Sequence, residues 1–132
     1  IFNYLIGNAD AHAKNYSFLY LEGKPRLAPA YDLLSTAVYP QLSKKMAMKI
    51  GEKYNPEDAY LRHWVQLVPD TQLAKKTTEN ALKTFASRLP KQAQALSKAL
   101  EKKGLSSPIF DKIQETIEIR CQHVLKYWGM NL

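Results

Sequence analysis

The chain has 132 residues, 45% of them hydrophobic and 23% charged, with 19 Lys and Arg against 12 Asp and Glu. This is the composition of one ordinary globular domain, which excludes a long disordered segment, a collagen-like repeat and a disulfide-stapled small protein. No apolar run approaches the roughly 18 residues of a membrane helix, the first residues lack the layout of a signal peptide, and the single cysteine, Cys121, cannot form an internal disulfide, so we expect a cytoplasmic protein without membrane contact.

The first part of the chain is predicted as short strands and loops. It begins without methionine inside an apolar stretch, residues 1–6, which is typical of the end of a buried helix, so we expect further chain upstream. Residues 16–21 and 26–28 have strand character and flank the turn signal Glu-Gly-Lys-Pro at 22–25, which predicts a β-hairpin. The apolar segment 46–50 is predicted as another strand.

From residue 55 onward the pattern is helical. Asn55 followed by Pro56 is typical of a helix start, and Pro90 is expected to interrupt an apolar stripe that repeats every four residues. The last helix has an apolar face in which Cys121 is a small core residue. The predicted helices cover residues 56–67, 70–89, 91–103 and 109–128. Four helices and a small sheet predict an α+β fold.

The net charge of +7 is unevenly distributed, since residues 1–40 are balanced and residues 41–132 hold the whole excess. Three of these cations, Lys75, Lys76 and Lys83, lie on one predicted helix. They form either a solvated helix surface or a face that contacts the phosphates of a nucleic acid. Composition leaves both open.

The segment from Gly7 to Asn15 concentrates Asp, His, Lys and Asn side chains. Because Asn and Asp compete for backbone hydrogen bonds, we expect a loop that displays its side chains. Within it, Asp10 and Asn15 have the Asp-x-x-x-x-Asn spacing of kinase catalytic loops, and Asp32 follows one hairpin later.

Phosphoryl transfer from ATP needs these residue types. One carboxylate orients and deprotonates the attacking hydroxyl, while an amide oxygen and a second carboxylate hold the magnesium ion that bridges the phosphates. A hairpin between Asn15 and Asp32 would fold the second carboxylate back beside the loop. We therefore expect Asp10, Asn15 and Asp32 to converge on one divalent-metal position.

The wider pattern resembles a known family. It reads Asn-x-Asp-x-His-x-Lys-Asn over residues 8–15 and Pro-Ala-Tyr-Asp-Leu-Leu-Ser over residues 29–35. This is similar to the C-terminal lobe of the HipA toxin kinases, the serine/threonine kinases of bacterial type II toxin–antitoxin modules. The resemblance implies one kinase-like lobe over residues 1–132, with a catalytic and metal-binding segment at 1–54 and a helical bundle at 55–132.

At the matching positions, the resemblance implies that Asp10 is the catalytic base and that Asn15 and Asp32 bind Mg²⁺ and, through it, ATP. Three neighbours of the nucleotide phosphates are also implied: His12, Lys14 and Tyr31. Lys14 stands four residues after the base instead of two as in eukaryotic catalytic loops, and Leu-Leu, not Phe-Gly, follows Asp32. A phenylalanine-based activation switch is therefore not expected.

The resemblance further implies a HipB-like DNA-binding antitoxin as partner, indirect DNA contact through it, and an aminoacyl-tRNA synthetase as substrate, whose phosphorylation stops translation and favours dormancy. The five glycines are scattered, so no glycine-rich phosphate loop occurs in this sequence, and no strand lysine paired with a helix glutamate can be identified. We therefore expect the N-terminal lobe to be absent and these 132 residues alone to fold but to be inactive.

Two other functions compete with a protein kinase. The first is a non-catalytic basic helical module that binds nucleic acid or an antitoxin. The second is a small-molecule phosphotransferase of the aminoglycoside or choline kinase type, although that type presents His-Gly-Asp at the base, where this chain has Asn-Ala-Asp. A zinc site at His12 is disfavoured because no second His or Cys lies near it in the sequence.

Overall fold

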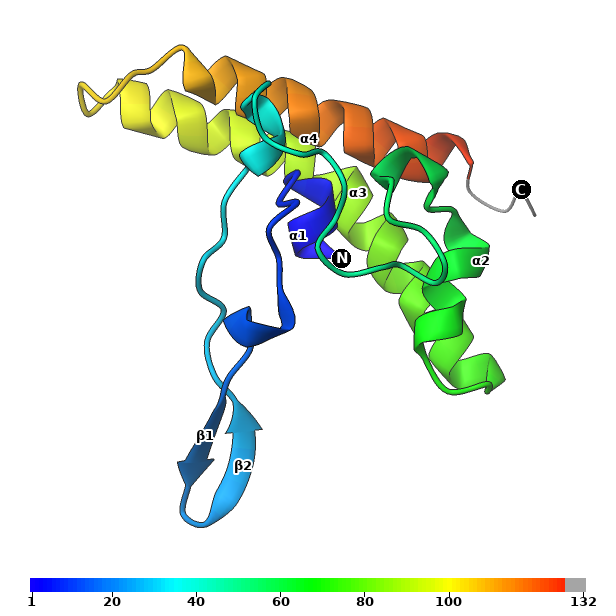
Figure 1. Ribbon diagram of the computed structural model, residues 1–132. Helices are drawn as coiled ribbons and strands as arrows, with labels where there is room; N and C mark the ends of the chain where they lie inside the picture. The colour runs from blue at the N-terminus through cyan, green and yellow to red at the C-terminus, as the bar shows by residue number, and fades with distance from the viewer. Residues whose placement is uncertain (128–132) are drawn as a thin grey trace.

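The computed structural model describes residues 1–127 and has an α+β fold built on two long helices. Helix α3 (Gln72–Glu101) and helix α4 (Ile109–Lys126) lie side by side and run in opposite directions (Figure 1). The shorter elements are helix α1 (Phe2–Leu5), helix α2 (Leu61–Trp64), strands β1 (Phe18–Leu21) and β2 (Lys24–Leu27), and 3₁₀ turns at Ala13–Asn15, Thr36–Val38, Pro56–Asp58 and Val65–Leu67. Within residues 1–127, no helix combines the length and apolar character needed to cross a membrane.

The apolar face predicted for the last helix is confirmed. Ile117 and Cys121 are buried in the core, and Ile113 and Val124 pack against it. Burial raises the pKa of the Cys121 thiol to about 11, which keeps it protonated as a small core residue. The predicted end of this helix, at 128–129, lies outside the described residues.

The predicted break at Pro90 is wrong, because α3 continues through it as one helix of 30 residues. Proline removes one backbone hydrogen bond and costs about 3 kcal/mol inside a helix. The residues around it supply what offsets this cost, since Ala86 is fully buried in the core and Leu89 and Ala93 pack against it. Packing of one face of α3 against the core therefore outweighs the tendency of proline to end a helix.

The predicted helix at 56–67 is also wrong, since this stretch is divided into the turn Pro56–Asp58, helix α2 and the turn Val65–Leu67. The backbone N–H of Tyr60 donates to Nδ1 of His63 at 3.0 Å, which caps a new helix start at Leu61. Ala59 is extended and buried. The predicted four helices therefore become two long ones and the short α2 in the described part of residues 55–132.

The strand predicted at 46–50 does not form. Its backbone bonds go to two different partners: Met46 N–H donates to the carbonyl of Tyr54, and Ala47 N–H donates to that of Ala9. Only an isolated bridge between Ile50 and Lys53 has strand pairing. The segment is therefore a connector that contacts the loop containing Asp10.

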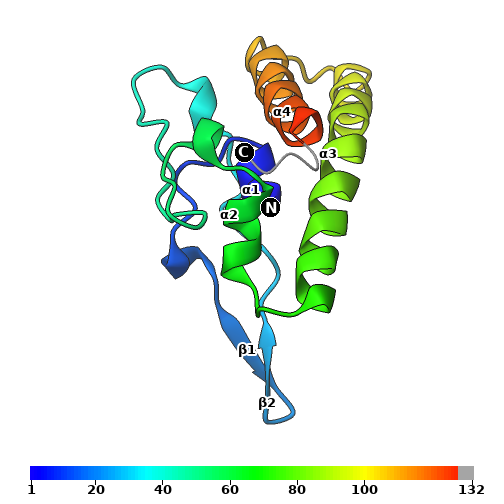
Figure 2. The same cartoon turned by 90° about the vertical axis from the view of Figure 1, so that its right-hand side faces the viewer.

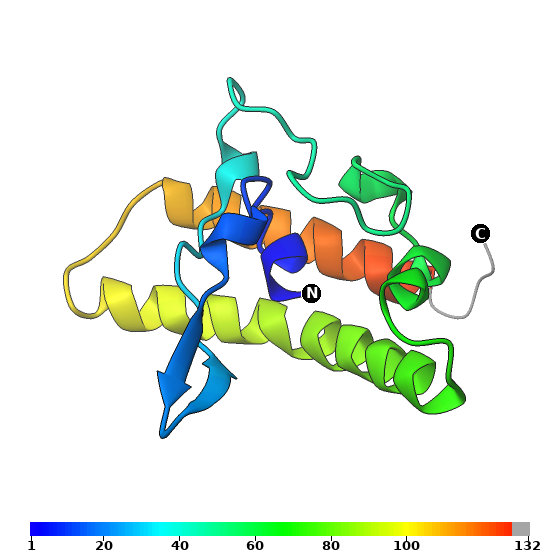
Figure 3. The same cartoon turned by 60° about the horizontal axis from the view of Figure 1, so that its bottom comes forward.

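The predicted hairpin is confirmed. β1 and β2 pair antiparallel, and the connecting residues Glu22 and Gly23 both have positive φ, as a tight two-residue hairpin turn requires. Both strands are exposed on all their residues. The hairpin projects away from the helices (Figures 1 and 3).

Helix α4 anchors both ends of the segment that contains the hairpin. Helix α1, which precedes the Asp10 loop, packs on α4, and so does the turn Thr36–Val38, which follows Asp32 (Figure 2). Gly7 joins these parts: its carbonyl accepts from Ala37 N–H at 2.9 Å, and its φ is +74°. A Cβ at Gly7 would lie 2.6 Å from Cγ2 of Thr116.

Gly7→Ala should therefore lower the free energy of unfolding by about 2–4 kcal/mol, because it adds a steric clash to an unfavourable backbone conformation. Gly23→Ala is the matched control: its φ is also +74°, but a Cβ there meets nothing within 4 Å. We expect Gly23→Ala to cost about 1 kcal/mol. Urea denaturation of both variants measures the difference, and equal costs would contradict close packing at Gly7.

Candidate active site

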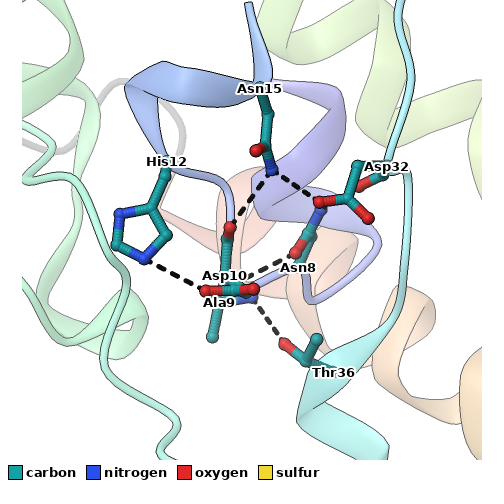
Figure 4. A network of polar contacts seen from close by, with 7 residues as sticks. All are labelled: Asn8, Ala9, Asp10, His12, Asn15, Asp32 and Thr36. Atoms are coloured by element: carbon teal, nitrogen blue, oxygen red, sulfur yellow. Dashed lines mark hydrogen bonds and ion pairs between the residues drawn. The ribbon is translucent and has the colours of Figure 1, made fainter.

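Asn15 and Asp32 lie in direct contact although a hairpin separates them in the sequence (Figure 4). Nδ2 of Asn15 donates to Oδ2 of Asp32 at 2.7 Å and to the backbone carbonyl of Asp10 at 3.4 Å. The structure therefore brings the amide and the second carboxylate together and places the Asp10 backbone beside them.

Local backbone geometry positions both side chains. The turn Ala13–Asn15 begins directly after His12, which is extended. Asp32 has φ +55°, a left-handed conformation that is uncommon outside glycine and is enriched for Asp and Asn. Its carboxylate thereby faces Asn15 (Figure 4).

The Asp10 carboxylate points away from this pair. Its Oδ1 lies 3.1 Å from Nε2 of His12, and the side chain is 59% exposed. Only the backbone carbonyl of Asp10 reaches Asn15 (Figure 4). Asp10 and His12 line an open cleft of about 400 Å³, together with Lys45 and Thr36.

Tyr31 lies at the base of the hairpin. Its hydroxyl donates to the backbone carbonyl of Lys14 at 2.9 Å and lies 2.9 Å from Oγ of Ser17. It therefore joins the residue before Asp32 to the turn that contains Asn15. The Lys14 side chain itself is exposed, and the structure brings its backbone, not its ammonium, into this contact.

Asn8 has a structural role that the motif alone does not predict. It is 5% exposed. Its Oδ1 accepts from the backbone N–H of Asp10 at 3.2 Å, and its Nδ2 donates to the carbonyl of Asp32 at 3.0 Å. The sequence signal was its place two residues before Asp10, which is the spacing of an Asx turn.

The donor chemistry of Asn15 and Asp32 fits Mg²⁺. This ion prefers carboxylate and amide oxygens and is typically held by one or two carboxylates together with substrate phosphates. Asn15 presents its Nδ2 to Asp32, and rotation of the amide would present Oδ1 instead.

Comparisons with known proteins find relatives of the family that the motif resembles. Residues 1–93 match the family model of the HipA-like C-terminal domain. The chain is 33% identical over 90 residues to the serine/threonine-protein kinase toxin HipA of Shewanella oneidensis (strain MR-1), covering 68% of this chain and 21% of that protein. It is 62% identical over 53 residues to Y4mE of Sinorhizobium fredii (strain NGR234), covering 40% of this chain and 13% of Y4mE.

A solved structure has a similar fold. The complex of the Shewanella oneidensis MR-1 toxin–antitoxin system, with HipA, HipB and operator DNA, contains a chain that matches with a TM-score of 0.77 and 26% identity, covering 94% of this chain and 29% of that chain. This chain thus spans less than a third of the length of each of these relatives. Because the family model covers most of its residues, the chain belongs to the HipA-like C-terminal domain family of kinases.

Proposed function

We propose that this chain carries the catalytic base and the metal ligands of an ATP-dependent serine/threonine protein kinase. The contact of 2.7 Å between Asn15 and Asp32, with the Asp10 backbone in the same network, supports this most strongly. Residues 1–132 then act as one C-terminal lobe, in which 1–54 supply the catalytic and metal-binding segment and 55–132 the helical support.

Each residue has a separate role in this proposal. The Asp10 carboxylate faces the cleft, where it accepts the proton of a serine or threonine hydroxyl as that oxygen bonds to the γ-phosphorus of ATP and ADP leaves. Asn15 and Asp32 hold Mg²⁺, which neutralises phosphate charge when bound. His12, beside Asp10, and Lys14 orient the phosphates. Tyr31 holds the turn Ala13–Asn15 in place through its hydrogen bond to the Lys14 carbonyl.

The proposed substrate is a protein hydroxyl on an aminoacyl-tRNA synthetase, and the proposed partner is a HipB-like antitoxin. The structurally similar complex described above, which contains HipA together with HipB and operator DNA, supports this partner.

A phosphotransfer assay tests the proposal. The full-length kinase that contains this segment is incubated with Mg²⁺, γ-labelled ATP and purified aminoacyl-tRNA synthetases of its host. We expect label on serine or threonine of one synthetase, loss of the label with Asp10→Asn, and none from residues 1–132 alone. Asp111→Asn, an exposed carboxylate in the first turn of α4, is the control that should retain activity. Equal labelling by the Asp10→Asn variant would contradict the proposal.

A second candidate function, DNA contact by the basic helices, rests on the charge excess in residues 41–132. On α3, Lys75 is paired with Asp70 at 2.5 Å and Lys76 with Glu79 at 3.1 Å. The Lys75 ammonium lowers the pKa of Asp70 by a hydrogen bond and by its charge. Exposed pairs of this kind contribute little to stability, so both lysines remain available to a phosphate.

This candidate predicts a strong salt dependence. In the kinase–antitoxin complex, Lys75→Glu with Lys76→Glu should lower the slope of log affinity for operator DNA against log salt by about 2, because fewer counterions are released. Lys24→Glu, on the hairpin, should leave the slope unchanged. Fluorescence anisotropy at several salt concentrations measures it, and an unchanged slope in the double variant would indicate a merely solvated face.

A further inference from the structure

Asn8 is a buried amide whose hydrogen bonds reach three separate segments. It follows Gly7 at the end of α1, and its Nδ2 donates to Oδ1 of Asn3 within that helix at 3.0 Å. The same Nδ2 donates to the carbonyl of Asp32, and Oδ1 accepts from the N–H of Asp10. One side chain therefore links the helix, the loop of the proposed base and the segment of the proposed metal ligand.

These bonds act on the parts of Asp10 and Asp32 that set their side-chain directions. The bond to Asp10 N–H fixes the backbone two residues after Asn8, as an Asx turn does. The bond to Asp32 holds the carbonyl of a residue in a left-handed conformation, which costs free energy and persists only when its surroundings enforce it. Because Asn8 is buried, loss of its amide would also leave partner groups without hydrogen bonds.

We propose that Asn8 is a positioning residue that fixes the spacing between the Asp10 base and the metal pair of Asn15 and Asp32. This inference rests on the proposed kinase function. Phosphoryl transfer is governed by the placement of the base relative to the metal and the phosphates, and a misplacement of about 1 Å costs about 10²-fold in rate. Asn8 does not touch the reacting atoms in this account, and it acts through Asp10 and Asp32.

Tyr4 in helix α1 provides a matched control outside the cleft. Its buried hydroxyl donates to the carbonyl of Pro56 at 3.0 Å. This bond ties α1 to the turn Pro56–Asp58 and reaches neither Asp10 nor Asp32. Tyr4→Phe should therefore lower stability without changing the distance between the base and the metal pair.

Two substitutions weaken the bond to Asp32 while keeping an oxygen near Asp10 N–H. Asn8→Asp retains an oxygen for Asp10 N–H but loses the donor to the Asp32 carbonyl. Asn8→Ser is neutral, and its side chain is one atom shorter, so that it serves the Asp10 link better than the Asp32 link. If the buried charge of Asn8→Asp prevents folding, Asn8→Ser still tests the proposal.

The test measures kcat, KM for ATP, Mn²⁺ affinity by electron paramagnetic resonance and melting temperature in the full-length kinase. We expect the Asn8 variants to lower kcat by about 10²-fold and Mn²⁺ affinity by at least about tenfold, as a displaced ligand would. Tyr4→Phe should also lower the melting temperature but leave kcat and Mn²⁺ affinity within about threefold of wild type.

The outcomes separate this inference from the function on which it rests. Asn8 variants with a lower melting temperature but wild-type kcat and Mn²⁺ affinity would overturn the positioning role. A wild-type protein that transfers no phosphate would overturn the proposed function, while the Mn²⁺ affinities of the Asn8 variants and Tyr4→Phe would still decide whether Asn8 fixes the metal pair.

Discussion

Replacing Asp10 with asparagine should lower kcat of the full-length kinase by about 10²–10⁴-fold and leave its affinity for MgATP nearly unchanged. Asp10 lines the cleft and its carboxylate contacts His12, whereas Asn15 and Asp32 contact each other and reach only the backbone carbonyl of Asp10. Loss of the carboxylate therefore removes the proton acceptor without removing a metal ligand. Steady-state kinetics and nucleotide titration calorimetry measure the two quantities separately.

Asparagine is chosen because the backbone groups of Asp10 have structural partners. Its N–H donates to Asn8 and its carbonyl accepts from Asn15, and both bonds survive the substitution. A variant that loses MgATP affinity and kcat in the same proportion would place Asp10 among the nucleotide-binding residues. Unchanged kcat would rule out a base at this position.

Asp32→Asn, unlike Asp10→Asn, should act on nucleotide affinity. We expect it to weaken MgATP binding by at least about tenfold, because one charged oxygen ligand of the ion is replaced by a neutral amide. Asparagine tolerates the left-handed backbone at this position, where φ is +55°, whereas alanine would add strain. Titration calorimetry with MgATP and with ATP in excess EDTA measures the metal-dependent part of the affinity.

The control for this variant is metal-free nucleotide binding, which Asp32→Asn should leave close to wild type or improve, because a negative charge near the phosphates is removed. If MgATP affinity were unaffected, Asp32 would not be a ligand. A fall in both affinities together would indicate that the loop has unfolded, and circular dichroism would reveal it.

Much of the site was predictable because its signals are local. A tight turn at 22–25 between strand-forming residues predicts a hairpin, and a hairpin brings the segment that contains Asp32 back towards Asn15. The apolar stripe of α4 likewise predicts its own buried face. These parts depend on short-range chemistry.

Other parts depend on partners far away in the sequence. The segment 46–50 is apolar, but its backbone bonds to Ala9 and Tyr54 instead of to a strand. Helix α3 continues through Pro90 because it packs along α4, Phe2 of α1 contacts its Phe85, and Leu89 and Ala93 pack against the core. The spacing of Asn8 and Asp10 suits an Asx turn, but the hydrogen bond from Asn8 to the carbonyl of Asp32, 24 residues later, follows only from the fold.

Anomalous scattering from Mn²⁺ tests the central claim most directly. Crystals of the full-length kinase grown with Mn²⁺ and a non-hydrolysable ATP analogue should give an anomalous peak about 2.0–2.3 Å from Oδ1 of Asn15 and from a carboxylate oxygen of Asp32, with the Asp10 carboxylate outside the coordination sphere. Nucleotide bound in the same crystals with Mn²⁺ held by other residues, more than about 5 Å from both side chains, would contradict the account.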